Sequence, residues 1–276
     1  MNPANISVLK RISHIRWGLR QIHEINKMIV IELMGGLGNW MFQIAFAEYL
    51  KQHFGKEVRL YIASKSPHSS NDLVNSIFEN WKESLTQNNN IQHFFENNLH
   101  PHNWEELICN NSALSFSGYF QNYNYVTTSF INKLNIPSKI GKKYPEINSS
   151  VFLHIRGGDY VNHWFHDVGL DTNYYPNAIK EFPEGTKFSV FTNDIEYAKS
   201  KAFLKDISYE FIQESEIDSL YLMSQCKGGI CANSTFSWWG AYLNPNRKLI
   251  IPSKWFNDTI TYTRGYMFPE ATVINV

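Results

Sequence analysis

Polar side chains end a short apolar run in the middle of the chain. Residues 151–155 read Val-Phe-Leu-His-Ile, and Arg156, two glycines and Asp159 follow directly. A buried strand of this kind would deliver His154 and Arg156 to a cleft, and the glycines let the backbone turn away. Ligands of open α/β sheets bind beyond the carboxyl ends of the strands, so a cation there favours an anionic ligand. Taken alone, the pattern also fits a surface arginine followed by an ordinary Gly-Gly turn.

A cluster of hydroxyl groups begins a predicted helix later in the chain. Residues 233–240 read Asn-Ser-Thr-Phe-Ser-Trp-Trp-Gly and follow an apolar strand. The first turn of such a helix has free backbone N–H groups and the positive end of the helix dipole beside Ser234 and Thr235. This combination predicts a phosphate site, although helix capping alone would explain one of the hydroxyls.

Asp194 follows a third apolar run, at residues 187–192. Its carboxylate could accept hydrogen bonds from a base or a ribose, or it could only cap the next helix. Arg156, Asp194 and the Ser234–Thr235 pair would converge at three strand ends, which favours a nucleotide diphosphate as ligand. No Asp-x-Asp occurs, and no His or carboxylate pair has the spacing of metal ligands on a helix face. We therefore expect no metal or other cofactor, and Arg156 and helix N–H groups would stabilise the diphosphate charge.

Alternating strands and helices position these residues in the second half of the chain. This alternation requires parallel strand pairing with right-handed crossovers, so the half is predicted to be a nucleotide-type α/β domain. The predicted strands are 151–155, 187–192, 208–212, 228–231 and 248–251, and the predicted helices are 171–182, 193–203, 216–226 and 233–243.

The first half opens with a predicted strand at 28–33, a glycine loop at 34–39 and a helix from about 40 to 54. The loop lacks the Gly-x-Gly-x-x-Gly spacing of dinucleotide-binding proteins, and no acidic residue ends a second strand about 20 residues later, so a dehydrogenase is disfavoured. Glycines such as Gly36 still permit close approach of the backbone to a ligand, and Asn39 adds an amide at the helix entrance.

A second polar strand end is predicted in the first half. Residues 115–121 alternate apolar with small or polar residues and predict a strand that ends at a cleft. An exposed ring such as Tyr119, beside an amide such as Gln121, suits a sugar, whose C–H bonds pack on the ring. Such rings more often belong to the core.

Composition restricts the class of protein. The 276 residues allow one large or two ordinary domains, and the hydrophobic fraction of 43% supports a real core. Lys plus Arg equals Asp plus Glu at 25 each, so no overall field favours nucleic acid. Three cysteines without metal-ligand spacing argue for a reducing compartment, so we expect a cytoplasmic protein.

Residues 1–27 differ from the rest because five basic residues face one acid, Glu24, for a net charge of +4. Apolar residues recur at intervals of three and four, as in an amphipathic helix, which could make a peripheral contact with the inner face of a membrane. Alternatively, the helix packs on the domain, or translation starts at Met28. The basic residues are Lys10, Arg11, Arg16, Arg20 and Lys27.

The chain resembles the bacterial α-1,2-fucosyltransferases, glycosyltransferase family eleven. The similar motifs lie within residues 28–256, and their order along the chain is the family's. The segment Ser-Thr-Phe-Ser-Trp-Trp-Gly is highly specific for the family. The motifs are Gly35–Asn39, Gly118–Gln121, His154–Tyr160, Phe191–Asp194 and Asn233–Ala241.

The resemblance implies a fold and a reaction. The fold is α/β of GT-B type, with two Rossmann-like domains and the donor site in the cleft between them. Residues 28–145 would form the acceptor-side domain and residues 146–276 the GDP-fucose-binding domain. The reaction is inverting, metal-independent transfer of L-fucose from GDP-fucose to O2 of galactose in a glycan acceptor, in surface polysaccharide or O-antigen synthesis. The alternative is a catalytically impaired sugar- or nucleotide-binding protein of the same fold.

The resemblance also implies roles for individual residues. Arg156 would hold the donor diphosphate, Ser234 and Thr235 its phosphate oxygens, and Asp194 would lie near the guanosine. Asn39 and the loop with Gly36 would face the reacting sugar, and Tyr119 and Gln121 the acceptor. The catalytic candidates are Arg156 with Asp159 and His154, although Asp159 could only brace Arg156. Two residues depart from the family pattern: Gly157 replaces a second arginine, and Trp40 replaces a glutamine.

Overall fold

The structure is a computed structural model that describes residues 28–63, 71–87, 91–96, 104–110, 113–244, 247–257 and 265–276. Residues 1–27 lie outside this part, so the amphipathic helix and its membrane contact stay predictions. No helix in the described part is long and apolar enough to cross a membrane.

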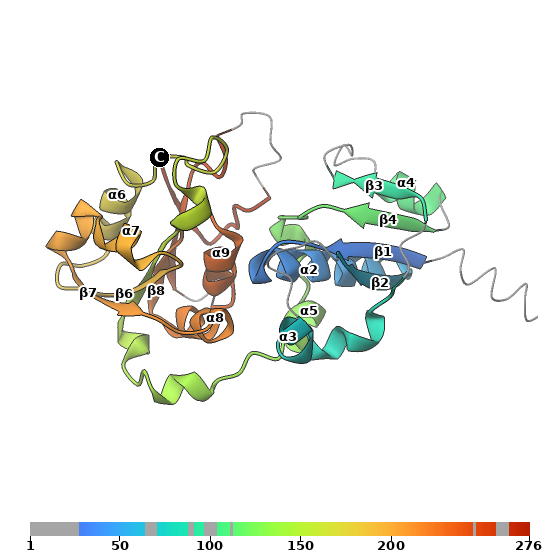
Figure 1. The fold of residues 1–276 in the computed structure, drawn as a ribbon, viewed down its shortest axis with the longest axis horizontal. Helices are drawn as coiled ribbons and strands as arrows, with labels where there is room; N and C mark the ends of the chain where they lie inside the picture. Colours follow the sequence, from blue (N-terminus) through green and yellow to red (C-terminus); the bar gives the residue numbers. More distant parts are fainter. Residues whose placement is uncertain are drawn as a thin grey trace, which may run out of the picture.

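A four-stranded parallel sheet forms in the first half of the chain (Figure 1). Its strands are β1 (Met28–Leu33), β2 (Glu57–Ile62), β3 (His93–Phe95) and β4 (Leu114–Ser117), in the order β2-β1-β4-β3. The helices of this half are α2 (Leu37–Phe54), α3 (Asn71–Asn75), α4 (Trp104–Asn110) and α5 (Thr128–Lys133).

The first helix begins earlier than the sequence predicted. Extended Gly36 (φ −88°, ψ −175°) is the N-cap of α2, and its carbonyl accepts hydrogen bonds from the N–H groups of Asn39 and Trp40. The glycine loop therefore shrinks to residues 34–36, and Asn39 lies within the first turn of α2 rather than before it. Trp40 is fully buried and lies 6.1 Å from Phe78, so this departure from the family pattern serves core packing.

The second half forms a six-stranded parallel sheet with β5 (Val151–Ile155) near its centre. The helices are α6 (Tyr174–Lys180), α7 (Ile195–Lys199), α8 (Glu216–Gln225) and α9 (Thr235–Tyr242), and short 3₁₀ turns link several elements. The other strands are β6 (Lys187–Thr192), β7 (Ser208–Ile212), β8 (Gly228–Ile230), β9 (Lys248–Pro252) and β10 (Thr272–Ile274), and the order is β10-β9-β8-β5-β6-β7.

Three details of the sequence prediction were wrong in this half. The helix predicted at 171–182 is limited to Tyr174–Lys180. β9 is not the last strand, because β10 pairs with it in parallel. The helix predicted to continue to Phe203 ends at Lys199, and a 3₁₀ turn at Ala202–Asp206 follows. The α/β class with two parallel Rossmann-like sheets, as in the GT-B fold, is confirmed.

The two halves meet where α2 packs against α9 (Figure 1). The ring of Phe42 on α2 lies 4.6 Å from that of Trp238 and 4.9 Å from that of Trp239. Trp239 Nε1 donates a hydrogen bond of 3.0 Å to the carbonyl of Gly38. A Cβ on Gly38 would lie 2.6 Å from a backbone atom of Thr235, so only glycine lets the helix starts approach this closely.

Candidate functional site

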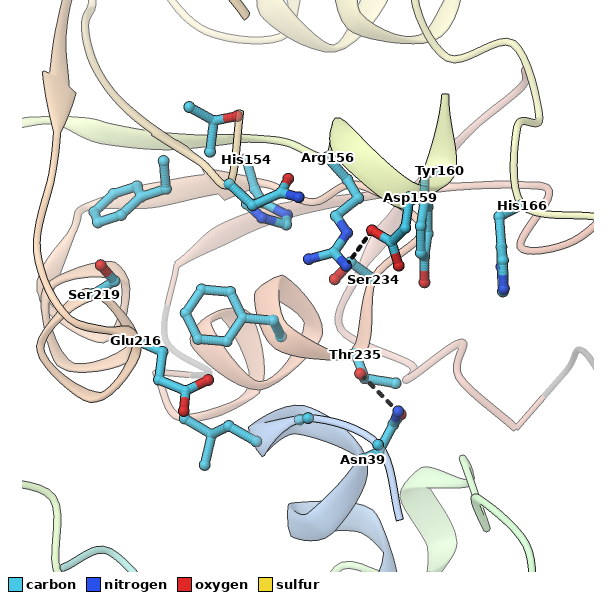
Figure 2. Close-up of a pocket in the computed structure, with 18 of the residues that line it drawn as sticks. Asn39, His154, Arg156, Asp159, Tyr160, His166, Glu216, Ser219, Ser234 and Thr235 are labelled. Carbon is cyan, nitrogen blue, oxygen red and sulfur yellow. Dashed lines mark hydrogen bonds and ion pairs between the residues drawn. The ribbon is translucent and has the colours of Figure 1, made fainter. Parts of the chain in front are cut away.

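A cavity of about 1250 Å³ lies between the two halves (Figure 2). Both helix starts and the carboxyl ends of strands from both sheets border it, as expected for parallel α/β sheets. The first half contributes residues 35–39, Glu96, Tyr119 and Gln121. The second half contributes His154, Arg156, Asp159, Tyr160, Phe165, His166, residues 191–193, Ile195, residues 212–214, Glu216, Ser219, residues 234–236, Trp255, Phe256 and Tyr266.

Arg156 is the only lysine or arginine among the described residues that line the cavity. One guanidinium nitrogen lies 2.6 Å from Asp159 Oδ1, and the guanidinium carbon lies 4.8 Å from the centre of the Tyr160 ring (Figure 2). Arg156 Nε is buried and has no hydrogen-bond partner in the described part of the chain. A guanidinium held by Asp159 that still has an unused donor is suited to bind an anionic ligand.

His154 is a poor candidate for a proton acceptor. Burial and the neighbouring Arg156 charge lower the pKa of His154 to about 3, so its imidazole is neutral at physiological pH. Its Nδ1 is buried and has no partner among the described residues. A neutral imidazole with an unused nitrogen can hydrogen-bond a ligand, but it holds a proton only weakly.

Asp159 is placed where it can brace Arg156, and its predicted catalytic role stays a prediction. Its carboxylate pairs with Arg156 in an i,i+3 ion pair, and its side chain is 58% exposed. A carboxylate that neutralises and orients the guanidinium is a positioning group for the cation.

Gly157, where the family pattern has a second arginine, leaves no room for a side chain. A Cβ there would lie 2.7 Å from Asp194 Cβ and 2.8 Å from the Tyr197 ring. Asn193 holds the Gly157 peptide from both sides, because its Oδ1 accepts from the Gly157 N–H at 2.9 Å and its Nδ2 donates to the carbonyl at 3.3 Å. The turn that aims Arg156 is therefore built around a glycine.

Replacing Gly157 with arginine is expected to destabilise the protein without raising turnover. The Cβ alone would push apart β5 and α7, so we expect the free energy of unfolding to fall by about 1–3 kcal/mol. Urea unfolding measures this change, and Gly157→Ala should show most of it because alanine has the same Cβ. An arginine variant of unchanged stability and higher turnover would contradict the steric argument.

The starts of α2 and α9 both border the cavity and carry no negative charge of their own. Neither helix has an acidic residue in its first turn or a side-chain N-cap hydrogen bond. Ser234 Oγ lines the cavity and makes no hydrogen bond within the described residues. Two uncompensated helix N-termini and one unused hydroxyl favour an anion beside Arg156.

Three predicted ligand-binding residues are bonded to each other across the halves. Thr235 Oγ1 donates to Asn39 Oδ1 at 3.1 Å (Figure 2), and Gln121 Nε2 donates to the same oxygen at 3.3 Å. Trp255 Nε1 donates to Gln121 Oε1 at 3.0 Å. These side chains therefore join the two halves, and the Thr235 hydroxyl proton is used in this contact.

Asp194 acts as a helix cap. Its Oδ1 accepts a hydrogen bond of 3.0 Å from the N–H of Tyr197 at the start of α7. It is not among the residues that line the cavity, whereas its neighbours Asn193 and Ile195 are. The structure shows the helix cap, and the predicted contact of Asp194 with the guanosine stays a prediction.

The cavity wall around Tyr119 holds this predicted residue and one that the sequence did not reveal. Tyr119 is 44% exposed and lines the cavity, which keeps its ring accessible to a sugar. Glu96 lies beside it, after the three-residue strand β3 in an Asn-rich segment, where no motif marks it. Glu216 and Ser219 at the start of α8 also line the cavity without having been predicted. No three described His, Cys, Asp or Glu residues could together hold a metal ion.

Comparison with known proteins gives one family. The model of "Glycosyl transferase family 11" matches residues 9–263. The O-antigen biosynthesis glycosyltransferase WbnK of Escherichia coli is 37% identical over 138 residues, which are 45% of this chain and 44% of that protein. The alpha-1,2-colitosyltransferase of Escherichia coli is 29% identical over 277 residues, covering 83% of this chain and 92% of that protein. The chain thus matches less than half the length of the first relative and most of the second.

Solved structures with a similar arrangement include two glycosyltransferases. The fucosyltransferase NodZ from Bradyrhizobium has a TM-score of 0.43 and 13% identity, over 80% of this chain and 94% of that one. A family 9 glycosyl transferase from Veillonella parvula has a TM-score of 0.47 and 11% identity, over 92% of this chain and 87% of that one.

Proposed function

The chain belongs to glycosyl transferase family 11, and from this premise we propose that it transfers L-fucose from GDP-fucose to a hydroxyl of a glycan acceptor. One observation carries the donor assignment: Arg156, whose buried Nε has no partner among the described residues, lines a cavity that two helix N-termini without an acidic residue or side-chain cap also border. A diphosphate is the anion that such a combination suits.

The proposed mechanism is a single displacement with inversion. The acceptor oxygen attacks the anomeric carbon from the side opposite the diphosphate and loses its proton, and the bond from that carbon to the phosphate oxygen breaks as GDP departs with the electron pair. Arg156, Ser234 Oγ and the N–H groups at the start of α9 face the oxygen on which negative charge develops. Because these groups take up the charge, the mechanism requires no metal ion, and we expect chelator to leave turnover unchanged.

The relatives support the choice of donor and acceptor class. One relative is named for O-antigen biosynthesis and the other for α-1,2 transfer of colitose, a sugar that differs from L-fucose by the absence of the 3-hydroxyl. GDP-colitose is therefore the second candidate donor. We propose a galactose-terminated glycan of a surface polysaccharide as acceptor, with O2 of galactose as the nucleophile.

Transfer assays with both donors test the proposal. Purified protein is incubated with GDP-fucose or GDP-colitose and galactose-terminated acceptors, and NMR of the product gives the linkage and anomeric configuration. We expect an α-1,2 product from GDP-fucose. Higher kcat/KM with GDP-colitose would reassign the donor, because a site that hydrogen-bonds the 3-hydroxyl discriminates against its absence. Binding of GDP without transfer from either donor would favour the catalytically impaired alternative.

A further inference from the structure

We propose that the carboxylate of Glu96 binds the attacking hydroxyl of the acceptor and takes its proton as the glycosidic bond forms. This assignment rests on the proposed glycosyl transfer. In the step, the acceptor O–H bond breaks while its oxygen bonds to the anomeric carbon, the electron pair of the broken sugar–phosphate bond leaves with GDP, and the proton passes from Glu96 to water.

The surrounding turn holds the Glu96 carboxylate in place by one oxygen only. Oε2 accepts hydrogen bonds from the backbone N–H groups of Tyr119, at 2.7 Å, and Phe120, at 3.0 Å. Oε1 makes no hydrogen bond within the described residues, and Glu96 lines the cavity. A fixed carboxylate with one oxygen unused can accept a hydrogen bond from a substrate hydroxyl.

The turn after β4 is shaped to admit this carboxylate. A Cβ on Gly118 would lie 2.5 Å from Glu96 Cβ and 2.6 Å from Glu96 Oε2, so only glycine allows the approach. Gln43 on α2 fixes the turn, because its Nε2 donates to the Gly118 carbonyl at 2.8 Å. Its Oε1 accepts from the N–H of Met34 at 3.1 Å, which ties the turn to the glycine loop.

Phe120 holds a strained backbone conformation at the same turn. Its φ of 48° lies in the left-handed region, which a bulky residue adopts rarely. The ring is buried and stacks on Phe46 at 4.2 Å, which holds the residue in that conformation. This conformation lets the consecutive N–H groups of Tyr119 and Phe120 point to the same oxygen, Glu96 Oε2. Backbone strain of this kind is concentrated at functional sites.

Other proton acceptors at the cavity are worse placed for the acceptor. Asp159 is paired with Arg156, and Glu214 with Lys143, whose Nζ lies 2.5 Å from it. Glu216 at the start of α8 also lines the cavity. All three belong to the second half, which carries the diphosphate site. An attacking hydroxyl must approach from the side opposite the leaving diphosphate, so its base is expected on the first half, where Glu96 is the only described carboxylate that lines the cavity.

The titration of Glu96 agrees with this role. Burial raises the pKa of its carboxyl group above the ordinary value, and the hydrogen bonds from Phe120 and Tyr119 only partly offset this. A carboxylate with a raised pKa accepts a proton more readily than an ordinary glutamate. Since only the ionised form can accept the proton, activity should fall as pH drops through this raised pKa.

Glu96→Gln is the variant that tests the assignment. It keeps the shape of the side chain and removes the proton acceptor, so we expect kcat for transfer to fall about 100- to 10,000-fold. GDP binding, measured by calorimetry, should stay unchanged because Arg156 and the start of α9 are intact. Wild-type kcat/KM should have an acidic limb above the ordinary glutamate range, and the residual activity of Glu96→Gln should lack that limb. The matched control is Glu196→Gln, an exposed carboxylate on α7, with full activity expected.

A second variant covers the case in which Glu96→Gln does not fold. Glu96→Asp keeps a carboxylate but withdraws it by one methylene, so kcat should fall while the acidic limb persists. Glu96→Gln with near wild-type kcat and an unchanged pH profile would overturn the assignment, as would Glu96→Asp with lowered stability and unchanged kcat. Inactive wild-type protein with both donors overturns the proposed function and this assignment with it, whereas an active wild type with an equally active glutamine variant overturns the assignment alone.

Discussion

Replacing Arg156 with alanine is expected to lower turnover with the GDP-sugar donor about 100- to 1,000-fold. Arg156 is the only lysine or arginine among the described cavity-lining residues, and Gly157 leaves no space for a second cation beside it. This one substitution therefore removes the charged side chain expected to stabilise the departing GDP. Steady-state kinetics with a galactose-terminated acceptor measure kcat and the KM of each substrate.

Two further variants at this site separate charge from geometry. Arg156→Lys keeps a positive charge but loses the planar fork that binds phosphate through two N–H groups, so its turnover should lie between that of the wild type and that of the alanine variant. Asp159→Asn removes the ion pair, seen at 2.6 Å, and should lower turnover less than Arg156→Ala. Its pH profile should match that of the wild type if Asp159 only positions the guanidinium. Nearly full activity of Arg156→Ala with GDP-fucose would contradict the donor assignment.

The parts of the fold that the sequence predicted correctly are those set by local pattern. The strands at 28–33, 151–155, 187–192 and 208–212 have the predicted bounds, because each is a β-rich run bounded by polar or turn residues. β3, β8 and β10 have three residues each, which is too short for a period to be visible, and of these only β8 was predicted. The ends of α2 and α7 differed from prediction because Gly36 caps one helix and a 3₁₀ turn follows the other.

The sequence could predict those residues of the candidate site that follow the carboxyl ends of strands or lie in the family motifs. Parallel topology brings Arg156 and Ser234 to one edge of the second sheet, and the family motifs add Asn39 and Tyr119 from the first half. The other relations in the site depend on contacts between residues far apart in the sequence. The bond from Thr235 to Asn39 exists only because the halves meet, and Glu96 gains its partners from a turn more than 20 residues later. Neither relation leaves a pattern in a single sequence.

The contact between the halves leads to a second prediction with a large effect. Trp239→Ala is expected to lower the free energy of unfolding by about 3–5 kcal/mol, the usual cost of removing a large buried ring. Trp239 is fully buried, lies 4.9 Å from the ring of Phe42 and 5.5 Å from that of Phe130, and donates its indole N–H to the Gly38 carbonyl. All three partners belong to the first half.

Urea unfolding of two tryptophan variants measures this effect. Trp164 is 78% exposed, so Trp164→Ala removes the same ring from the surface and should change stability by less than about 0.5 kcal/mol. Trp239→Phe keeps a ring but loses the hydrogen bond, so its stability should lie between that of the wild type and that of Trp239→Ala. Similar stabilities of Trp239→Ala and Trp164→Ala would show that the contact contributes little.

Trp239→Ala should also lower turnover, because the contact of Trp239 with Phe42 and Gly38 aligns the start of α9 with the start of α2. The buried cluster that contains Trp239 runs without a break from the first sheet to β9, so this cluster joins the halves, beside a second buried cluster that lies in the second half alone. We therefore expect wild-type protein to unfold in a single transition rather than one for each sheet. If the halves unfold separately, the packing of α2 against α9 does not couple their unfolding, although the hydrogen bonds of Asn39 and Gln121 also join the halves.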